Sequence, residues 1–336
     1  MSNVFDKLIE KAKGTGKRII LTESEDERVL SAAGMAAEMG LCTVVLLGKT
    51  EELEGLENRY TKEMLKNIVF VDVTKETDKK KEYVNMLYEL RKNKGMTEEM
   101  AQKQVNDKLV YAMLMLRSGD ADGVVSGAVN HTADVLRPAF QIVKVKPGTS
   151  KVSSVFIFES PNEEKFGENG FMVFADCGVN PNPTDEDLAE IAILSSETAE
   201  KICGMTPRVA MLSYSSKSGD EMTDENVCKV KRAYQMVKER KPDLIIDGEL
   251  QSDAALVKSV ADSKAPGSPV EGRANVLIFP DLNAGNIAYK LVQRLAGVKA
   301  VGPVLQGLNQ PVNDLSRGTS AEEIVLDMAI TVLQSL

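Results

Sequence analysis

The stretch R-I-I-L-T-E-S-E-D-E-R, residues 18–28, decides the fold class. Its first part, residues 18–22, is a short apolar run of the kind that forms a buried strand. The acidic part that follows is typical of a helix start, where carboxylates favour the positive end of the helix dipole. Small or apolar residues then recur at helical spacing: Val29, Ala33, Ala36 and Gly40. The stretch therefore predicts a βα unit.

The same alternation continues outward from this stretch as far as residue 127. Apolar runs suited to strands lie at residues 42–47, 68–73 and 122–127, and helical periodicity covers residues 79–94 and 97–117. Strands that alternate with helices are typical of parallel βαβ units. The first part of the chain is therefore predicted to form a doubly wound sheet covered on both faces.

The pattern changes near residue 145. K-V-K-P-G-T-S, residues 144–150, is typical of a connector, and the apolar runs at 152–158 and 171–174 look like a hairpin. Further βα units follow as far as residue 302. We predict two α/β/α domains with largely parallel sheets. The first is discontinuous, residues 1–147 and 306–336, and the second comprises residues 148–305.

Composition indicates an ordinary soluble globular chain. Of the 336 residues, 43% are hydrophobic and 27% charged. No apolar run is long enough for a bilayer, and residues 1–10 look like an amphipathic helix instead of a signal peptide. The net charge of −9 argues against nucleic acid as a partner. The four cysteines are scattered, which predicts reduced thiols and a cytoplasmic protein: Cys42, Cys177, Cys203 and Cys228.

Several kinds of site are excluded or disfavoured. The chain has one histidine, His131, so a multi-histidine metal site is excluded, and general-base chemistry needs a carboxylate or His131. L-G-K-T at residues 47–50 ends like a phosphate-binding P-loop, but position 43 is Thr where that motif requires Gly. No G-x-G-x-x-G follows a strand. ATP and NAD are therefore disfavoured, and no metal is predicted.

A candidate anion site lies in N-Q-P-V-N-D-L-S-R-G-T-S-A-E-E, residues 309–323. It follows the apolar run 300–305, interpreted as a strand, and precedes the last helix. A strand, a Gly-containing polar loop and a helix start together collect anions through free backbone N–H groups. Ser316 and Arg317 on such a loop suit a phosphate or carboxylate. The alternative is a surface turn with a solvated arginine.

Two other segments place an arginine beside small polar residues or at a helix end. S-G-A-V-N-H-T-A-D-V-L-R-P, residues 126–138, ends a strand at Ser126 and begins a helix near Asn130 and Thr132, where free N–H groups attract anions. Pro138 is expected to place Arg137 at a break. Alternatively Asn130 or Thr132 is only a helix cap and Arg137 extends into water. For Arg91, in E-L-R-K-N-K-G, the stronger interpretation is a cation at a helix C-terminus.

Glu323 and Cys177 each have a structural and a catalytic interpretation. Ser320 to Glu323 is an S-x-x-E capping box, which explains Glu323 as a cap, but its carboxylate would also lie near Ser316 and Arg317 and could act as a base. Cys177 could be a nucleophile, yet no His or Lys lies near it in sequence to lower its pKa. A buried thiol is the favoured interpretation.

The motifs as a set resemble those of the phosphate acetyltransferase family. The resemblance is carried by the segments already quoted at 126–138 and by F-A-D-C-G-V-N-P-N-P at 174–183, D-G-E-L-Q-S-D-A-A-L at 247–256 and P-V-N-D-L-S-R-G at 311–318. It runs along the whole chain. It implies reversible acetyl transfer between acetyl phosphate and coenzyme A, which is a substrate, with no cofactor. It also implies an isocitrate/isopropylmalate dehydrogenase-like fold, an active site in the interdomain cleft, and a homodimer.

The resemblance also implies roles for single residues. Ser316 and Arg317 match the family's active-site Ser-Arg, and Arg91 and Arg137 match arginines implicated in substrate binding. The family's proposed base is an aspartate at the start of the last helix, where this chain has Glu323. We expect the coenzyme A thiolate to attack the acetyl group directly in a ternary complex.

Three alternatives stay open at this point. A phosphate butyryltransferase would share the chemistry and need a roomier acyl pocket. An NAD(P)-dependent dehydrogenase of a 2-hydroxy acid is compatible with the implied fold, although the expected cluster of metal-binding aspartates is missing. A catalytically inactive regulatory relative would keep the fold, but the intact Ser-Arg motif argues against it.

Overall fold

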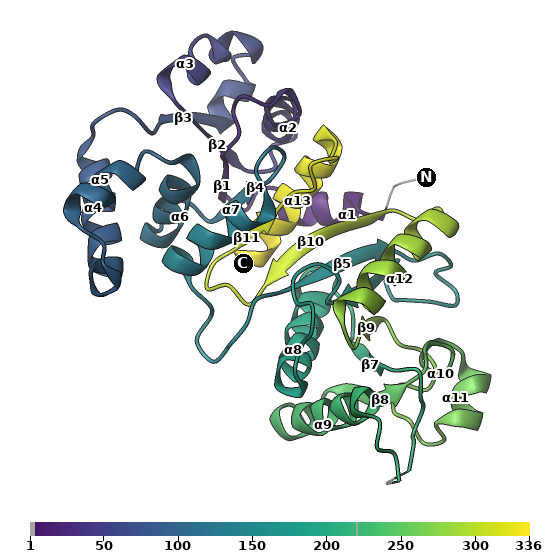
Figure 1. Ribbon diagram of the computed structural model, residues 1–336. Coiled ribbons are helices and arrows are strands. Elements are labelled where there is room, and N and C mark those ends of the chain that lie inside the picture. Colours follow the sequence, from purple (N-terminus) through teal and green to yellow (C-terminus); the bar gives the residue numbers. More distant parts are fainter. Residues whose placement is uncertain (1–3, 220) are drawn as a thin grey trace. The chain divides into compact units, whose positions relative to one another are not determined.

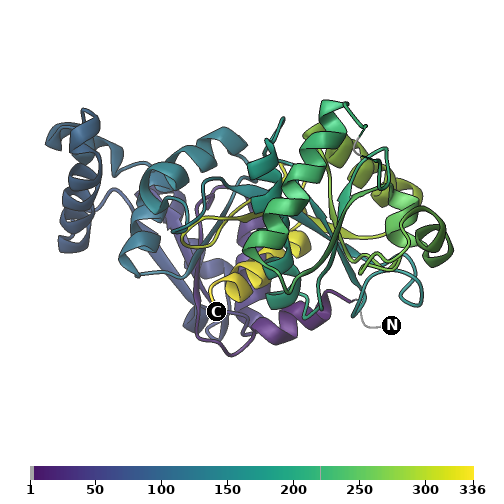
Figure 2. The same cartoon turned by 90° about the horizontal axis from the view of Figure 1, so that it is seen from below.

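The computed structural model describes residues 4–219 and 221–336, which form two compact units (Figures 1 and 2). The terminal unit comprises residues 5–147 and 308–336, and the central unit comprises Val4 and residues 148–307. The division predicted from the sequence placed the return to the first domain at residue 306. The first three residues of the helix expected at 1–10 lie outside the described residues, and the helix itself, α1, spans Asp6–Ala12.

The terminal unit contains a five-stranded, fully parallel sheet in the order β11-β4-β1-β2-β3. The chain runs from β1 to β2 and β3 on one side, then returns to place β4 on the other side of β1. The strands are β1 (Arg18–Leu21), β2 (Thr43–Gly48), β3 (Ile68–Asp72), β4 (Gly123–Ser126) and β11 (Val312–Asp314).

Helices cover both faces of this sheet, because its strands are apolar on both sides. The first face packs against α2 (Glu27–Glu38) and α13 (Ala321–Gln334), and α1 lies against α13. The second face packs mainly against α6 (Lys108–Ser118), with α4 (Asp78–Arg91), α5 (Glu98–Gln104) and α7 (Thr132–Pro138) beyond it. Figure 2 shows α4 and α5 at one end of this unit. The short α3 (Thr50–Leu53) lies against β2 and β3.

The central unit contains a mixed six-stranded sheet in the order β10-β5-β6-β9-β7-β8. β10, β5 and β6 are antiparallel, which confirms the hairpin predicted from the sequence, and β6, β9, β7 and β8 are parallel. The strands are β5 (Ser153–Glu159), β6 (Phe171–Ala175), β7 (Arg208–Leu212), β8 (Ile245–Leu250), β9 (Val276–Ile278) and β10 (Ala300–Gln306).

The central sheet is also covered on both faces. α8 (Asp185–Lys201) and α9 (Glu225–Arg240) pack on one face, and α10 (Ser252–Leu256), α11 (Lys258–Lys264) and α12 (Leu282–Leu295) lie on the other (Figure 1). Under α12, Tyr289 stacks on Phe156 with the ring centroids 4.0 Å apart. The predicted class, α/β with largely parallel sheets, is confirmed.

Two predicted elements differ from the structure. The helix expected at 97–117 is two helices, α5 and α6, because Asp107 caps the second one by accepting hydrogen bonds from the backbone N–H groups of Leu109 and Val110. The break expected at Arg137 does not occur there. α7 continues through Pro138 into a π-helical turn at Ala139–Val143, and such a wider turn accommodates a proline inside a helix.

The strand that leads into the Ser-Arg loop is also different from the expected one. The apolar run 300–305 is β10, which belongs to the central sheet. Asn313 and Asp314, expected in a polar loop, lie in β11 and are buried, because β11 pairs with β4 at the edge of the terminal sheet.

None of the described helices is both long and apolar enough to cross a membrane.

Candidate active site

The candidate site lies in the terminal unit, at the carboxyl ends of three neighbouring strands. Asp314 ends β11 opposite Ser126, which ends β4, and Thr22 follows β1. The Ser126 and Thr22 hydroxyls are 2.6 Å apart and both residues are buried. Ser126, a predicted substrate-binding residue, therefore joins two strand ends inside the protein. In open parallel sheets this edge is where ligands bind.

The Ser-Arg pocket is an open hollow of about 390 Å³ beside the 315–319 loop. Its wall brings together residues from two predicted segments: Asn130, His131, Thr132, Ala133, Leu315, Ser316 and Arg317. Ser316 and Arg317 are exposed. Within the described part of the chain, no hydrogen bond or ion pair engages the Arg317 guanidinium, so its fork of N–H donors remains available to an anion.

The arginine pocket, about 550 Å³, adjoins it and shares Asn130. Three cations line it, Arg91, Lys94 and Arg137. The Arg91 Nε atom is buried without a hydrogen-bond partner among the described residues. The remaining lining residues are Gly95, Met96, Met100, Gln104, Asp107, Leu109, Val110, Asp134, Pro138 and Gln141.

The charge balance of the arginine pocket favours an anion, because three cations line it against two carboxylates, Asp107 and Asp134. Arg137 is exposed and lies 3.5 Å from the Asp134 carboxylate, a weak surface pair that leaves most of its donors free. Asp107 is already engaged as the cap of α6. The structure thus places six predicted site residues on the walls of the two pockets: Arg91, Asn130, Thr132, Arg137, Ser316 and Arg317.

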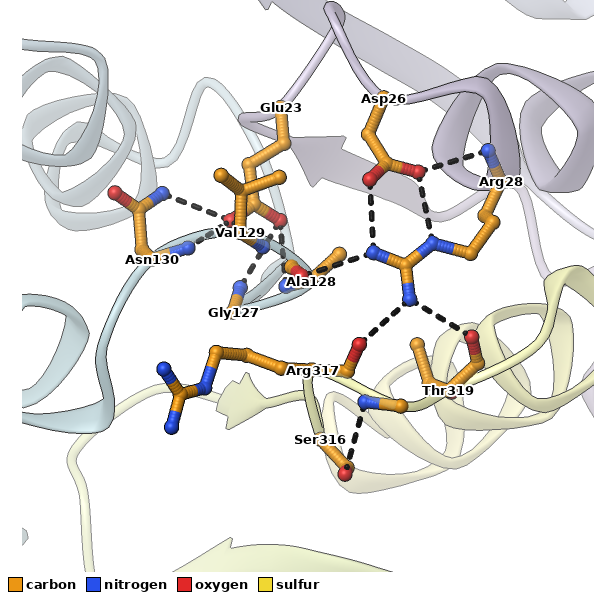
Figure 3. Close-up of polar contacts among 11 residues, drawn as sticks. Glu23, Asp26, Arg28, Gly127, Ala128, Val129, Asn130, Ser316, Arg317 and Thr319 are labelled. Atoms are coloured by element: carbon orange, nitrogen blue, oxygen red, sulfur yellow. Dashed lines mark hydrogen bonds and ion pairs between the residues drawn. The ribbon is translucent and has the colours of Figure 1, made fainter.

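Of the residues expected to offer free N–H groups near the start of α7, Asn130 does not offer one, because the loop before α7 already holds a carboxylate. The Glu23 carboxylate accepts hydrogen bonds from the backbone N–H groups of residues 127, 128, 129 and 130 at 2.9–3.0 Å, and from Asn130 Nδ2 at 2.8 Å (Figure 3). The residue that caps α7 is His131, without a side-chain hydrogen bond, instead of Asn130 or Thr132. Glu23 and the 127–130 loop are called the Glu23 nest below.

Arg28, in the first turn of α2, ties the two loops together. Its Nη1 donates to the carbonyl oxygens of Arg317 at 2.8 Å and Thr319 at 3.1 Å, and its Nη2 donates to the Ala128 carbonyl at 2.9 Å (Figure 3). Asp26 orients the guanidinium through Nε and Nη2. In Figure 3 the Arg317 side chain extends away from Arg28. Sequence reasoning missed this residue.

Asp314 makes a further connection between these two segments of the chain. Its Oδ2 accepts a 2.6 Å hydrogen bond from Thr132 Oγ1, while its Oδ1 is buried without a partner among the described residues. Burial raises the pKa of Asp314 to about 6. Gly127, at φ +114°, makes this approach possible, because a Cβ there would lie 2.4 Å from Asp314 Oδ1.

Glu323 forms the capping box that the sequence predicted. Its Oε2 accepts from the Ser320 N–H at 2.9 Å and from Thr319 Oγ1 at 3.1 Å, and the Ser320 side chain accepts from the Glu323 N–H. Glu323 is exposed and lies on the wall of neither pocket described above. One turn further along α13, Asp327 is buried, and burial together with the charges of Glu323 and Asp314 raises its pKa to about 8.

The remaining candidates for chemistry lie elsewhere. Cys177 is buried, and burial raises its thiol pKa, so a reactive thiolate is disfavoured. His131 is exposed at the cap position of α7 and lines the Ser-Arg pocket. Over residues 4–219 and 221–336, no group of three His, Cys, Asp or Glu side chains is placed to hold a metal ion.

Comparison with known proteins gives a consistent result. Residues 3–332 match the family described as “Phosphate acetyl/butaryl transferase”. The phosphate acetyltransferase of Thermoanaerobacterium thermosaccharolyticum is 51% identical over 337 residues, 99% of each chain. A phosphotransacetylase from Streptococcus pyogenes has a similar structure, with TM-score 0.90 and 42% identity over 100% of this chain and 99% of its own. A 4-hydroxythreonine-4-phosphate dehydrogenase from Klebsiella pneumoniae shares the fold alone, with TM-score 0.53, 10% identity and 96% and 100% coverage.

Proposed function

The chain belongs to the phosphate acetyl/butyryl transferase family, and we propose that its two pockets serve reversible acetyl transfer between acetyl phosphate and coenzyme A. The protein is then an acyltransferase whose partners are small molecules, with coenzyme A as a substrate and no further cofactor. One observation carries the proposal. Exposed Ser316 and Arg317 line a pocket that adjoins a second pocket lined by Arg91 and Arg137.

The phosphate of acetyl phosphate is assigned to the Ser-Arg pocket. The Arg317 fork can hold two phosphate oxygens at once, and the Ser316 hydroxyl supplies a third donor. Thr132 and Asn130 lie on the same wall and are polar. Donors aimed at charge that develops on the phosphate and the acetyl oxygen are worth about 2–4 kcal/mol each.

The phosphates of coenzyme A are assigned to the arginine pocket. Arg91, Lys94 and Arg137 supply positive charge, which the chain as a whole lacks because its net charge is −9. The unpartnered Arg91 Nε is a donor that a phosphate oxygen would satisfy. Met96, Met100 and other apolar side chains of this wall suit the less polar parts of the substrate.

The proposed reaction is a direct transfer in a ternary complex. A base removes the proton of the coenzyme A thiol, whose pKa is ~8.5, and the thiolate attacks the acetyl carbonyl carbon. A C–S bond forms, the C–O bond to phosphate breaks, and phosphate leaves with the electron pair. Buried Cys177, with its raised pKa, supports a route without an acetyl-enzyme. An acetyl group trapped on Cys177 by mass spectrometry would contradict this route.

We propose Glu323 as the base. Because Glu323 also belongs to the capping box, a substitution that keeps the cap can test the basic role by itself. In Glu323→Gln the amide oxygen can still accept from the Ser320 N–H, so the cap is kept while the basic carboxylate is removed. We expect kcat to fall about 100-fold or more, as for loss of a general base. Glu322→Gln, an exposed neighbour in the same turn, is the matched control. Unchanged turnover in Glu323→Gln would assign Glu323 to capping alone.

The function itself is tested by mixing the protein with coenzyme A and acetyl phosphate and following thioester absorbance. We expect thioester to form in proportion to protein, and absence of thioester would refute the proposal. Butyryl phosphate in the same assay measures the acyl preference. Heat of binding on addition of NAD(P) in calorimetry would favour the dehydrogenase alternative.

The protein is further proposed to act in the cytoplasm as a homodimer. No disulfide joins the four cysteines in the described part of the chain, as expected of a reducing compartment. On α12 of the central unit, Ile287, Leu291 and Leu295 are 58%, 52% and 83% exposed at a spacing of four residues, and such an apolar helix face is costly to leave in water. Sedimentation of wild type and Leu291→Lys tests the dimer. Equal dimer content in wild type and Leu291→Lys would exclude this face of α12 as the dimer contact.

A further inference from the structure

The Glu23 nest lies where an open parallel sheet normally binds its ligand. In the order β11-β4-β1-β2-β3, the chain changes direction between β1 and β4, and ligands of such sheets bind outside the carboxyl ends of the strands at this switch point. The loop after β4 points four successive N–H groups into that position, an arrangement that attracts anions. An anion site is therefore built there.

The anion in this site is part of the protein. The Glu23 side chain follows β1, and its two carboxylate oxygens take all four N–H groups and the Asn130 amide. Glu23 is only 1% exposed. A substrate phosphate cannot occupy this position without displacing Glu23, so the phosphate is confined to the outer side of the loop, toward Arg317.

One of the residues that Glu23 holds, Asn130, lies on the walls of both pockets. Asn130 is bonded to Glu23 through both its backbone and its side chain. Thr132 follows two residues later and is fixed from the opposite side by Asp314. The position of this wall therefore depends on a carboxylate that touches neither pocket.

We propose that Glu23 is a positioning residue of the acetyl-transfer site. Its carboxylate acts as a built-in anion that holds the 127–130 loop, and with it Asn130 and Thr132, in place for the substrates. The proposal rests on the proposed function for its activity readout. The hydrogen-bond geometry predicts a second readout, amide exchange, which is independent of activity.

Glu23→Gln is the most conservative way to break the nest. The variant keeps the size of the side chain but replaces one acceptor oxygen with an NH2 group, which meets backbone N–H donors instead of accepting from them. We expect kcat/KM for acetyl phosphate to fall about 100-fold, the usual effect of misplacing substrate-positioning groups by about 1 Å. Amides 127–130 should exchange faster in hydrogen exchange.

Asp122→Asn is the matched control. Asp122 accepts from the Arg18 N–H at 2.9 Å at the opposite, amino-terminal edge of the same two strands, so it also connects the two strands but lies far from the pockets. We expect near wild-type kcat/KM and unchanged exchange at 127–130. Equal losses of activity in the two variants would reduce Glu23 to a structural residue and overturn the proposal.

Chemical rescue distinguishes a missing anion from general damage. In Glu23→Ala the loop lacks its carboxylate, and formate is small enough to replace it. We expect formate, but not chloride at equal ionic strength, to raise kcat/KM about 10-fold or more in Glu23→Ala, and to leave Asp122→Asn unchanged.

The outcomes separate the proposal from the function on which it rests. If wild type forms no thioester, the proposed function fails, and amide exchange in Glu23→Gln still decides whether Glu23 holds the loop. If wild type is active and Glu23→Gln lies within about threefold of it, or exchange at 127–130 is unchanged, the positioning role is refuted. Absence of formate rescue would also contradict a role for the anion.

Discussion

The two units each wrap a loop around a buried carboxylate, but they take that carboxylate from different places. In the terminal unit, G-A-V-N at 127–130 wraps Glu23. In the central unit, C-G-V-N at 177–180 follows β6 and wraps Asp176, which accepts from the N–H groups of residues 178, 179 and 180 at 2.9–3.1 Å and from Asn180 Nδ2 at 2.6 Å. Both loops end in Val-Asn, and both use the Asn side chain as well as the backbone.

The two nests differ in the sequence separation between the carboxylate and the N–H groups that it binds. Asp176 is two to four residues from its donors, so this nest is a local turn of the kind that aspartate forms with its own backbone. Glu23 is 104 to 107 residues from its donors, so this nest joins the ends of β1 and β4. A local nest shapes one loop, whereas a long-range nest fixes two strand ends relative to each other. Only the long-range nest adjoins the two pockets described above.

Loss of Arg28, the second long-range tie, is expected to have the largest effect. Arg28→Ala removes the donors that hold the carbonyl oxygens of Arg317, Thr319 and Ala128. The loops would drift apart, and we expect kcat/KM in the thioester assay to fall about 100-fold or more. Arg59→Ala, which loses only an exposed pair with Glu27, is the control. Similar activity in the two variants would show that the long-range ties are dispensable.

Loss of the local nest at Asp176 is expected to lower stability instead of activity. Asp176→Asn removes an acceptor oxygen from a buried cluster that also includes the Ser154 hydroxyl, at 2.6 Å. We expect the free energy of unfolding to fall by about 2–3 kcal/mol, the cost of leaving buried donors unpaired. Urea unfolding measures it, with exposed Asp262→Asn as the control. A loss below about 0.5 kcal/mol would mean that the local nest contributes little.

A third carboxyl, Asp327, is buried without a nest. We expect its substitution to have the smallest effect on stability, and this effect should depend on pH. Its pKa rises from 3.8 to about 8 through burial and the charges of Glu323 and Asp314. Between these values the folded state holds a proton that the unfolded state has lost, so unfolding becomes easier as pH rises. Asp327→Asn removes this slope. We expect its stability relative to wild type to improve by about 1–2 kcal/mol between about pH 6.5 and 8 in urea unfolding. A constant difference would refute the raised pKa.

The sequence was most informative where the signal is local. Apolar runs followed by amphipathic helices predicted the parallel units, and the S-x-x-E box at Ser320 predicted the start of α13. β11 was missed because it has three residues, of which two, Asn313 and Asp314, are polar and buried only through pairing with β4. The helix break at Asp107 was missed and the break expected at Arg137 does not occur, because caps and π turns depend on a few atoms.

The residues of the candidate site also differ in whether a local sequence signal identified them. Ser316, Arg317, Arg91 and Arg137 were identified from motifs, and the structure places all four on pocket walls. Glu23 and Arg28 were not identified, because in E-S-E-D-E-R they look like an ordinary acidic helix start. The one available signal was the arginine in a first helical turn, where a cation is unfavourable and needs a partner. Hydrogen bonds across 100 residues cannot be inferred from spacing.

The most direct test of the account is the rate of thioester formation in Arg317→Ala and Arg317→Lys. Both variants should keep the wild-type melting temperature, because the Arg317 side chain is exposed and its carbonyl still accepts from Arg28. If the guanidinium holds the phosphate through its two-pronged geometry, kcat/KM for acetyl phosphate falls at least about 100-fold in Arg317→Ala and is only partly retained in Arg317→Lys. Wild-type kcat/KM in Arg317→Ala would show that the Ser-Arg loop does not bind the phosphate of acetyl phosphate.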